Sequence, residues 1–200
     1  STHCISSAAS DVYKRQDYTA GHIFPTTGAA GALAHALRAV TKPGDEVLTF
    51  APYFPEYHPY VEGAGARLTV VPADIESFQI NFAAFEAALN PEVAVVLINT
   101  PNNPSGAVYS AETLDRLAGI LRAKQAEYGH DIFLISDEPY REIVFDGGTQ
   151  PYPAKFYDNT LTCYSWSKSL SLPGERIGYV AVNPQATDAE PVSYTHLRAH

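Results

Sequence analysis

The sequence predicts an α/β fold built on a mainly parallel, seven-stranded sheet with helices on both faces. Two observations support this fold class: short apolar runs alternate with helical patterns, and several of those runs are continuously apolar and β-branched. The run Val93–Asn99 is the clearest case, because strands of this composition are covered on both faces. The expected strands are His22–Pro25, Glu46–Phe50, Arg67–Val71, Val93–Asn99, Ile132–Ser136, Leu161–Tyr164 and Ile177–Val182.

Three of the segments between these strands have helical spacing. One follows the first strand, a second follows Asn81, and the longest runs from an N-cap serine, Ser110, to a terminal glycine, Gly129. A turn is expected at 42–45, where the sequence reads Lys-Pro-Gly-Asp. The apolar residues that share a helical face are Ala32, Leu33, Ala36, Leu37 and Val40, then Phe82, Phe85 and Leu89, then Leu114, Leu117 and Leu121.

Composition narrows the class of protein. The chain has 200 residues, 46% hydrophobic and 18% charged, which is enough for a sizeable core in one domain or two. A net charge of -9 without a basic patch argues against nucleic acid or an anionic membrane as a partner, although an ordinary polar surface gives the same charge. No apolar run reaches the roughly 18 residues of a membrane span. The chain has two cysteines and no His-rich cluster, so neither a disulfide framework nor a metal site is expected. The same cysteine content predicts the cytoplasm as the location.

Both ends of the chain are set apart from the rest. Residues 1–16 and 192–200 have neither helical nor strand periodicity, and both resemble translated sequencing-adapter sequence. The alternative is a pair of natural disordered tails. The expected domain is therefore 17–191, and the two ends take no part in the prediction of the fold or the site.

A serine-rich stretch with one lysine follows the sixth expected strand. Ser165-Trp-Ser-Lys168 places the amine of Lys168 at the end of a buried strand, where burial would favour the neutral, nucleophilic amine. The hydroxyls of Ser165 and Ser167, with the planar cation of Arg176, suit a phosphate group. A solvated polar loop is the alternative explanation.

Polar residues also end the fourth and fifth expected strands. Asn103 lies in a rigid turn, Pro101-Asn-Asn-Pro-Ser-Gly106, of which turn formation alone explains only the prolines and the glycine. Asp137 ends a buried strand, where a carboxylate needs a positive partner, unless it caps a helix. Glu138 and Arg141 are expected to form a surface ion pair.

Two further stretches follow the first and second expected strands. The small residues Gly28, Ala29 and Ala30 open a helix, whose free N–H groups can bind a phosphate, or they simply allow close packing. Neither a P-loop nor a GxGxxG pattern is present, which disfavours nucleotides. In Ala51-Pro-Tyr-Phe54, the ring of Phe54, or of its neighbour Tyr53, can stack on a flat heterocycle or pack at the surface.

Together these motifs resemble the class I/II aminotransferases, the fold-type I enzymes that use pyridoxal 5'-phosphate. Ser165-Trp-Ser-Lys168, Gly174-Glu-Arg-Ile-Gly-Tyr179 and Asn103-Pro-Ser-Gly106 match the family's patterns, in order and with family-like spacing, over nearly all of 17–191. The resemblance implies the fold of the family's large domain, with the small domain missing. It also implies a Schiff base between Lys168 and pyridoxal phosphate.

The resemblance assigns a role to each candidate residue. The catalytic set would be Lys168, which moves the proton, Asp137, which keeps the pyridine nitrogen protonated, and Tyr140, which bonds the 3'-oxygen. No metal is implied. The cofactor-binding residues would be Gly28, Ala29, Ala30, Ser165, Ser167 and Arg176 at the phosphate, Asn103 and Tyr140 at the 3'-oxygen, Phe54 on the ring, Asp137 at the ring nitrogen and Lys168 at the aldehyde.

The implied activity moves an amino group between an aspartate-like L-amino acid and a 2-oxo acid such as 2-oxoglutarate, in a homodimer. The family's carboxylate-binding arginine belongs to the small domain, and Arg198 lies in the suspect end. This 200-residue core is therefore expected to be inactive or nearly so. The alternatives are a carbon–sulfur β-lyase with the same cofactor residues, and the aminotransferase-like effector domain of a transcription regulator. The uncut gene would discriminate among the three.

Overall fold

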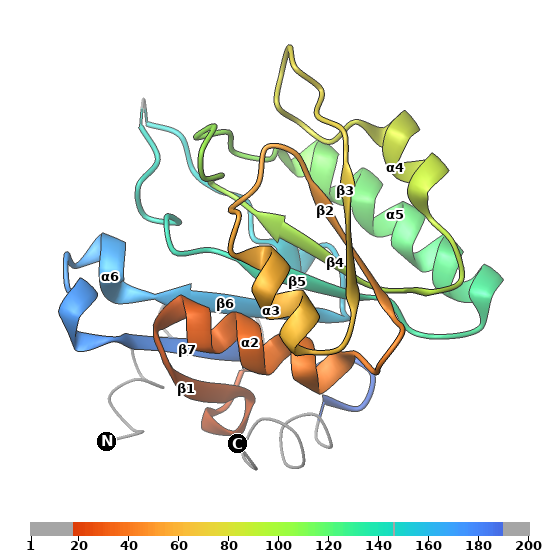
Figure 1. The fold of residues 1–200 in the computed structure, drawn as a ribbon. Helices are drawn as coiled ribbons and strands as arrows, with labels where there is room; N and C mark the ends of the chain where they lie inside the picture. Colours follow the sequence, from red (N-terminus) through yellow and green to blue (C-terminus); the bar gives the residue numbers. More distant parts are fainter. Residues whose placement is uncertain (1–17, 146, 190–200) are drawn as a thin grey trace.

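The computed structural model describes residues 18–145 and 147–189 and has a single seven-stranded sheet at its centre (Figure 1). The strand order is β1-β7-β6-β5-β4-β2-β3. The predicted α/β class is thereby confirmed. The predictions about residues 1–16 and 192–200 lie outside the described residues.

All seven predicted strands are present, each within two residues of its expected ends. The first begins one residue late, because a short 3-10 turn, η1 (Ala20–His22), takes up His22. The strands are β1 (Ile23–Thr27), β2 (Glu46–Phe50), β3 (Arg67–Val71), β4 (Val93–Asn99), β5 (Phe133–Asp137), β6 (Thr160–Ser165) and β7 (Ile177–Val182).

The sheet is mainly parallel, with one reversed strand. Four neighbouring pairs, from β3 through β2, β4 and β5 to β6, run parallel. Strand β7 runs antiparallel to both β1 and β6. The start of β7 therefore lies at the edge where the other six strands end, called the carboxyl edge below; the opposite edge is the amino edge.

Helices cover both faces of the sheet. Figure 1 shows α2 (Gly28–Val40) and α3 (Tyr57–Gly63) on one face and α4 (Phe82–Ala88) and α5 (Ala111–Tyr128) on the other. The expected caps are present. The side chains of Asn81 and Ser110 accept hydrogen bonds from the first turns of α4 and α5, and Gly129 ends α5 with a positive φ of 74°. Helix α3 was not predicted, because Pro59 and the aromatic residues around it obscure its spacing.

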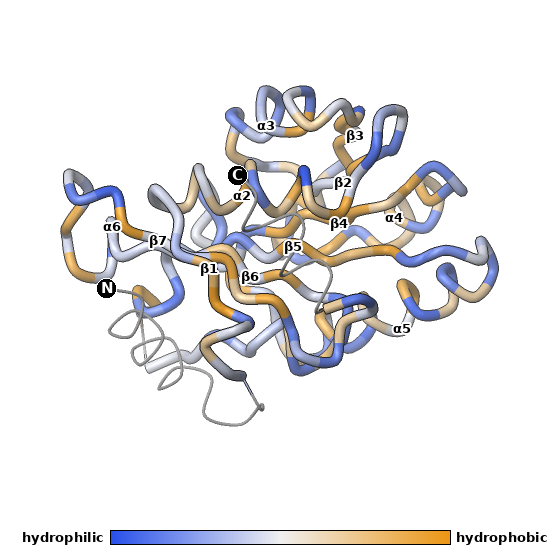
Figure 2. Tube along the Cα trace, turned by 90° about the horizontal axis from the view of Figure 1, so that it is seen from below, coloured by the Kyte–Doolittle hydropathy of each residue, from blue (hydrophilic) through white to orange (hydrophobic). Residues whose placement is uncertain are grey.

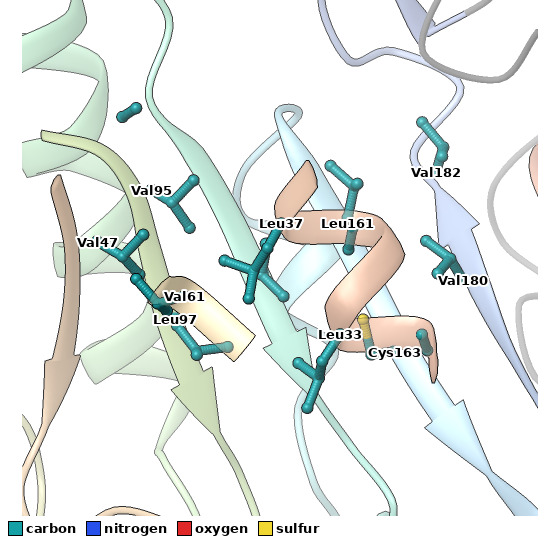
Figure 3. Close-up of a cluster of buried hydrophobic side chains, with 14 of the residues drawn as sticks. Leu33, Leu37, Val47, Val61, Val95, Leu97, Leu161, Cys163, Val180 and Val182 are labelled. Atoms are coloured by element: carbon teal, nitrogen blue, oxygen red, sulfur yellow. The ribbon is translucent and has the colours of Figure 1, made fainter. Parts of the chain in front are cut away.

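The core on the α2 face shows why the helical spacing was informative. Leu33 and Leu37 point from α2 onto the strands, where they meet Leu161, Cys163 and Val180 (Figure 3). All five are almost fully buried, as predicted for the apolar stripe of this helix. Cys163 is a free thiol.

A second core lies on the other face, beneath α4 and α5, and includes Phe85, Leu117 and Leu121. Alternate side chains of β4 serve the two cores, since Val95 faces the first and Val96 the second. Figure 2 shows the resulting hydrophobic centre, with hydrophilic residues at the outer turns.

A third, aromatic cluster covers β1, β6 and β7 where neither α4 nor α5 lies over them. Its buried members include Tyr164 and Tyr179, and Tyr152 and Trp166 pack against them. Three short elements complete the fold: η2 (Pro153–Lys155), α6 (Trp166–Ser169) and η3 (Pro173–Glu175). Within the described residues, no helix has the length and apolar character needed to span a membrane.

Candidate functional site

A cavity of about 380 Å³ opens at the carboxyl edge of the sheet. Every residue predicted for the site lines this cavity except Gly28, which is in close contact with the guanidinium of Arg176. The lining comes from the ends of five different strands or the segments that follow them, and from the residues just before β7. The predicted residues that line it are Ala29, Ala30, Phe54, Asn103, Asp137, Tyr140, Ser165, Ser167, Lys168 and Arg176.

Asp137 lies at the floor of this cavity, as the last residue of β5. Its side chain is buried, with 5% of the residue exposed. Carboxylate oxygen Oδ2 accepts a hydrogen bond of 2.7 Å from the Tyr57 hydroxyl, whereas Oδ1 is buried without a partner. Burial raises the pKa of Asp137 to about 7, although the Tyr57 hydrogen bond lowers it. No helix follows Asp137, so the capping explanation is wrong.

Lys168 lies on α6, on the wall of the cavity, with its ammonium nitrogen Nζ 5.8 Å from the centre of the Tyr140 ring. The expectation that this lysine is buried is wrong, because its side chain is exposed to solvent. The strand β6 ends at Ser165, and the following turn of helix carries the lysine out of the core. Tyr140 is half-buried, and burial, followed by the charge of Asp137, raises its pKa.

Gly28 and Arg176 form a close contact beside the cavity. A Cβ atom on Gly28 would lie 2.7 Å from Nη2 of Arg176, and the φ of Gly28 is +75°, so glycine is required twice over. Arg176 itself has a left-handed backbone, with φ of 50°. Such a conformation is uncommon outside glycine and concentrates at functional sites. Together they place a guanidinium beside the first turn of α2, next to Ala29 and Ala30.

The two serines occupy the same wall. Ser165 is 2% exposed and ends β6, and Ser167 is half-buried on α6. Both line the cavity near Arg176. Hydroxyls, a guanidinium and the amides at the start of α2 are the groups that hold phosphate in proteins.

Asn103 lines the cavity, and Asn99, which the sequence analysis missed, fixes its position. The Asn99 side chain is 4% exposed, accepts a hydrogen bond of 2.6 Å from the Asn103 amide and donates one of 2.9 Å to the Asp137 carbonyl oxygen. One buried side chain thus joins the ends of β4 and β5. Its place as the last residue of a buried strand was the signal that could have found it.

An aromatic group from the loop after β2 and from α3 forms another wall. Phe54 lines the cavity, whereas its neighbour Tyr53 stacks on Tyr57, with ring centres 6.5 Å apart. The rings of Phe54 and Tyr57 pack in a T-shaped pair, with centres 5.9 Å apart. Tyr57 was also missed, because nothing in the local sequence indicates a contact with Asp137.

Glu138 and Arg141 form an ion pair, but it is buried rather than at the surface. Their side chains are 0% and 7% exposed, and the Nε of Arg141 lies 2.7 Å from a Glu138 oxygen. Arg141 also lies 4.1 Å above the Tyr152 ring. The pair is buried because the aromatic cluster covers the turn after β5.

A slightly larger cavity, about 410 Å³, lies at the amino edge, and several of its polar groups are already bonded. Both ring nitrogens of His130 lie 2.9 Å from backbone carbonyl oxygens, and the Asp45 carboxylate accepts from the Lys42 amide. Among the described residues, this cavity has no buried side-chain polar atom without a partner. Size alone therefore does not identify the site.

Comparisons with known proteins assign the chain to a family. The family profile described as aminotransferase class I and II matches residues 4–194. The chain belongs to the class I and II aminotransferase family. Members of this family transfer amino groups between amino acids and 2-oxo acids.

Several relatives within this family can be compared in detail. The chain is 36% identical to the aspartate/prephenate aminotransferase of Cereibacter sphaeroides, over 82% of this chain and 41% of that protein. It is 34% identical to a probable N-acetyl-LL-diaminopimelate aminotransferase of Bacillus subtilis, over 79% and 39%. An aminotransferase structure from Eubacterium rectale superimposes with a TM-score of 0.94 and 49% identity, over 99% and 50%. The chain therefore spans about half the length of the family members that it matches.

Proposed function

We propose that this chain is the pyridoxal-phosphate-binding core of an aminotransferase. The observation that carries the proposal is the buried Oδ1 of Asp137, which has no partner and lies in the same cavity as Lys168. A buried carboxylate oxygen without a donor is costly, and a protonated ring nitrogen would supply that donor.

Pyridoxal phosphate fits the residues around this cavity. The guanidinium of Arg176, the hydroxyls of Ser165 and Ser167 and the amides of Gly28, Ala29 and Ala30 would hold the phosphate. Phe54 would lie against the ring. Asn103 and Tyr140 would hydrogen-bond the 3'-oxygen. A Cβ on Gly28 would displace Arg176, so the close contact between the two supports this arrangement.

The chemistry would be divided between two side chains. When bound, the cofactor supplies an aldehyde that bonds amines and a ring that accepts electrons from the substrate's α-carbon. Asp137 would hold the proton on the ring nitrogen. Lys168 would hold the cofactor at its aldehyde carbon, with loss of water, and its amine, when free, would move a proton at the substrate's α-carbon. Its exposure to solvent allows the amine to be displaced and to return.

The proposed substrates are an aspartate-like L-amino acid and a 2-oxo acid such as 2-oxoglutarate. Relatives named as aspartate aminotransferases in Thermotoga maritima and Rhizobium meliloti, 31% and 33% identical, support this choice. We place the enzyme in the cytoplasm as a homodimer, in line with its two cysteines and the family resemblance.

Turnover by the 200-residue chain is expected to be very low. Among the described residues that line the cavity, Arg176 is the single arginine, and it lies at the phosphate end. No second arginine there is available for the substrate's α-carboxylate. A transamination assay with aspartate and 2-oxoglutarate tests this, and robust turnover would contradict it.

The absorption spectrum with added pyridoxal phosphate tests the cofactor proposal. We expect a yellow adduct, reducible by borohydride, that Lys168→Ala abolishes. Lys155→Ala is the matched control, since Lys155 is an exposed lysine outside the cavity. Mass spectrometry after reduction would place the added mass on the peptide that contains Lys168. An adduct that survives in Lys168→Ala would overturn the assignment.

A further inference from the structure

Tyr57 makes a hydrogen bond that the activity described so far does not account for. It lies on α3, 80 residues from Asp137 along the chain, and donates its hydroxyl to Oδ2 at 2.7 Å. The residue is 1% exposed, so water does not compete for this bond. Resting on the proposed function, we propose that Tyr57 is a positioning residue, which holds Oδ2 so that Oδ1 faces the ring nitrogen of the cofactor.

The packing around Tyr57 supports this role. Tyr53 stacks on its ring, and Phe54 forms a T-shaped pair with it, with ring centres 5.9 Å apart. The cluster leaves the phenol little freedom to turn away from Asp137. Since Phe54 also lines the cavity, the same aromatic group orders the wall of the site and its carboxylate.

The chemistry at the two carboxylate oxygens is asymmetric. A phenol hydroxyl donates to Oδ2, whereas Oδ1 has no donor among the residues that the structure describes. Hydrogen bonds to the charged form favour that form, so Tyr57 favours the carboxylate over the carboxylic acid. A carboxylate keeps a pyridine nitrogen protonated, whereas a carboxylic acid does not.

Other ionisable groups on three neighbouring segments interact with Asp137. Tyr60 lies on α3, Cys163 on β6 and Tyr140 on the turn after β5, and each interacts with the charge of Asp137. Lys168 and Arg176 lie across the cavity. Among the described residues, the hydrogen bonds to the Asp137 side chain come from Tyr57 alone.

The first test follows Asp137 in the cofactor-free chain. The infrared band of a protonated carboxyl group is titrated with pH, and Asp137→Asn identifies which part of it belongs to Asp137. Without a substitution, the midpoint should lie near 7. Tyr57→Phe should move it upwards by about one to two pH units, the value of a hydrogen bond to a charged group.

Tyr157→Phe is the matched control. Tyr157 is a 2% exposed tyrosine whose hydroxyl bonds Gln125 and the Ile132 carbonyl oxygen, away from the cavity. Its loss should leave the midpoint unchanged. A midpoint that stays in place in Tyr57→Phe, or that moves equally in both variants, would overturn the proposal. If Tyr57→Phe does not fold, 3-fluorotyrosine at position 57, a stronger donor, must lower the midpoint.

The second test compares two ligands. Pyridoxal phosphate carries the ring nitrogen, and its 1-deaza analogue has carbon there. Tyr57→Phe should weaken binding of the first about tenfold and leave the second unchanged. An equal loss for both ligands would show a packing role only and overturn the proposal. If the unsubstituted chain does not bind pyridoxal phosphate, the proposed function fails, and the infrared titration still decides the role of Tyr57.

Discussion

Asp137 and Glu46 are both buried carboxylates, at opposite edges of the same sheet. Glu46 begins β2 at the amino edge and is 4% exposed. Oε2 accepts from Arg67 and Asn90, each at 2.8 Å, and Oε1 accepts from Thr69. Although burial alone would raise the pKa of Glu46, these hydrogen bonds and the charge of Arg67 lower it.

Asp137, at the carboxyl edge, has one hydrogen bond and one oxygen without a partner, and burial raises its pKa. Both side chains are little exposed to solvent, but Asp137 lies deeper in the protein and has fewer hydrogen-bond partners. A carboxylate that serves only the fold is surrounded by donors of the same chain. A carboxylate that binds a ligand has one oxygen available to accept a hydrogen bond from that ligand.

The largest expected consequence concerns pH and stability in the cofactor-free chain. The pKa of Asp137 rises from 3.8 to about 7 on folding, so the folded chain keeps a proton that the unfolded chain releases. The contribution of this proton to the free energy of unfolding is fully present below about pH 4. It is lost as the pH rises through 7, by roughly 4 kcal/mol at most. Urea unfolding measures the free energy of unfolding of the unsubstituted chain and of Asp137→Asn. The difference between the two values should grow as the pH rises from 4 to 8.

Glu46 gives the opposite sign. Its pKa is lowered in the folded chain, so its contribution is present above its ordinary pKa of 4.5 and is lost as pH falls below it. The free energies of unfolding of Glu46→Gln and of the unsubstituted chain should therefore diverge as the pH rises in the acid range. If both carboxylates shifted stability in the same direction with pH, the contrast between the two edges would be wrong.

Cofactor affinity should separate the same two residues. Asp137→Asn removes the charge proposed to face the ring nitrogen and should weaken pyridoxal phosphate binding roughly a hundredfold. Glu46→Gln should leave that affinity unchanged and lower the free energy of unfolding by about 1–2 kcal/mol. The loss is modest because the side chain of Arg67 is 60% exposed. Fluorescence titration with the cofactor and urea unfolding measure the two effects; an affinity loss in Glu46→Gln would contradict the separation.

Asn99 and Asn183 extend the contrast to buried amides. Asn99 joins the backbones of Asn103 and Asp137 at the carboxyl edge, and Asn183, 1% exposed, joins those of Ala154, Tyr157 and Gln185 at the amino edge. Each alanine variant should lose about 2 kcal/mol of unfolding free energy, since Asn99 makes two hydrogen bonds and Asn183 makes two and a longer third. Asn99→Ala alone should also weaken the binding of pyridoxal phosphate, by about tenfold.

Equal cofactor affinities in the two asparagine variants would mean that Asn99 serves the fold alone. The comparison is informative because both residues are buried and both bridge two backbone segments. Urea unfolding confirms that the two variants carry similar losses before their affinities are compared.

The strands and the long helices could be predicted from the sequence because their signals are local. Val93–Asn99 is continuously apolar, and Ser110 and Gly129 mark the ends of α5. The motif residues at the strand ends also came together in one cavity. Helix α3 was not predicted because Pro59 and a mixed aromatic pattern obscure the helical spacing of its seven residues.

What the sequence could not predict depends on contacts between distant segments. Tyr57 lies 80 residues from Asp137, and Asn99 lies 38, so no local pattern links them. Arg176 precedes its strand and would lie at the amino edge if β7 were parallel to its neighbours. The antiparallel pairing of β7 with β6 brings it to the cavity. The exposure of Lys168 follows from the helical turn after β6, which strand patterns do not describe.

The smallest expected effect compares two glycines with the same backbone. Gly28 and Gly129 have φ of +75° and +74°, but a Cβ on Gly28 would meet Arg176, whereas a Cβ on Gly129 would meet nothing within 4 Å. Gly129→Ala should therefore cost only backbone strain, about 1 kcal/mol. Gly28→Ala should cost the same strain and, in addition, weaken inorganic phosphate binding by moving Arg176. Phosphate protection against urea unfolding measures this, and equal protection in both variants would show that the Gly28–Arg176 contact serves packing rather than the anion.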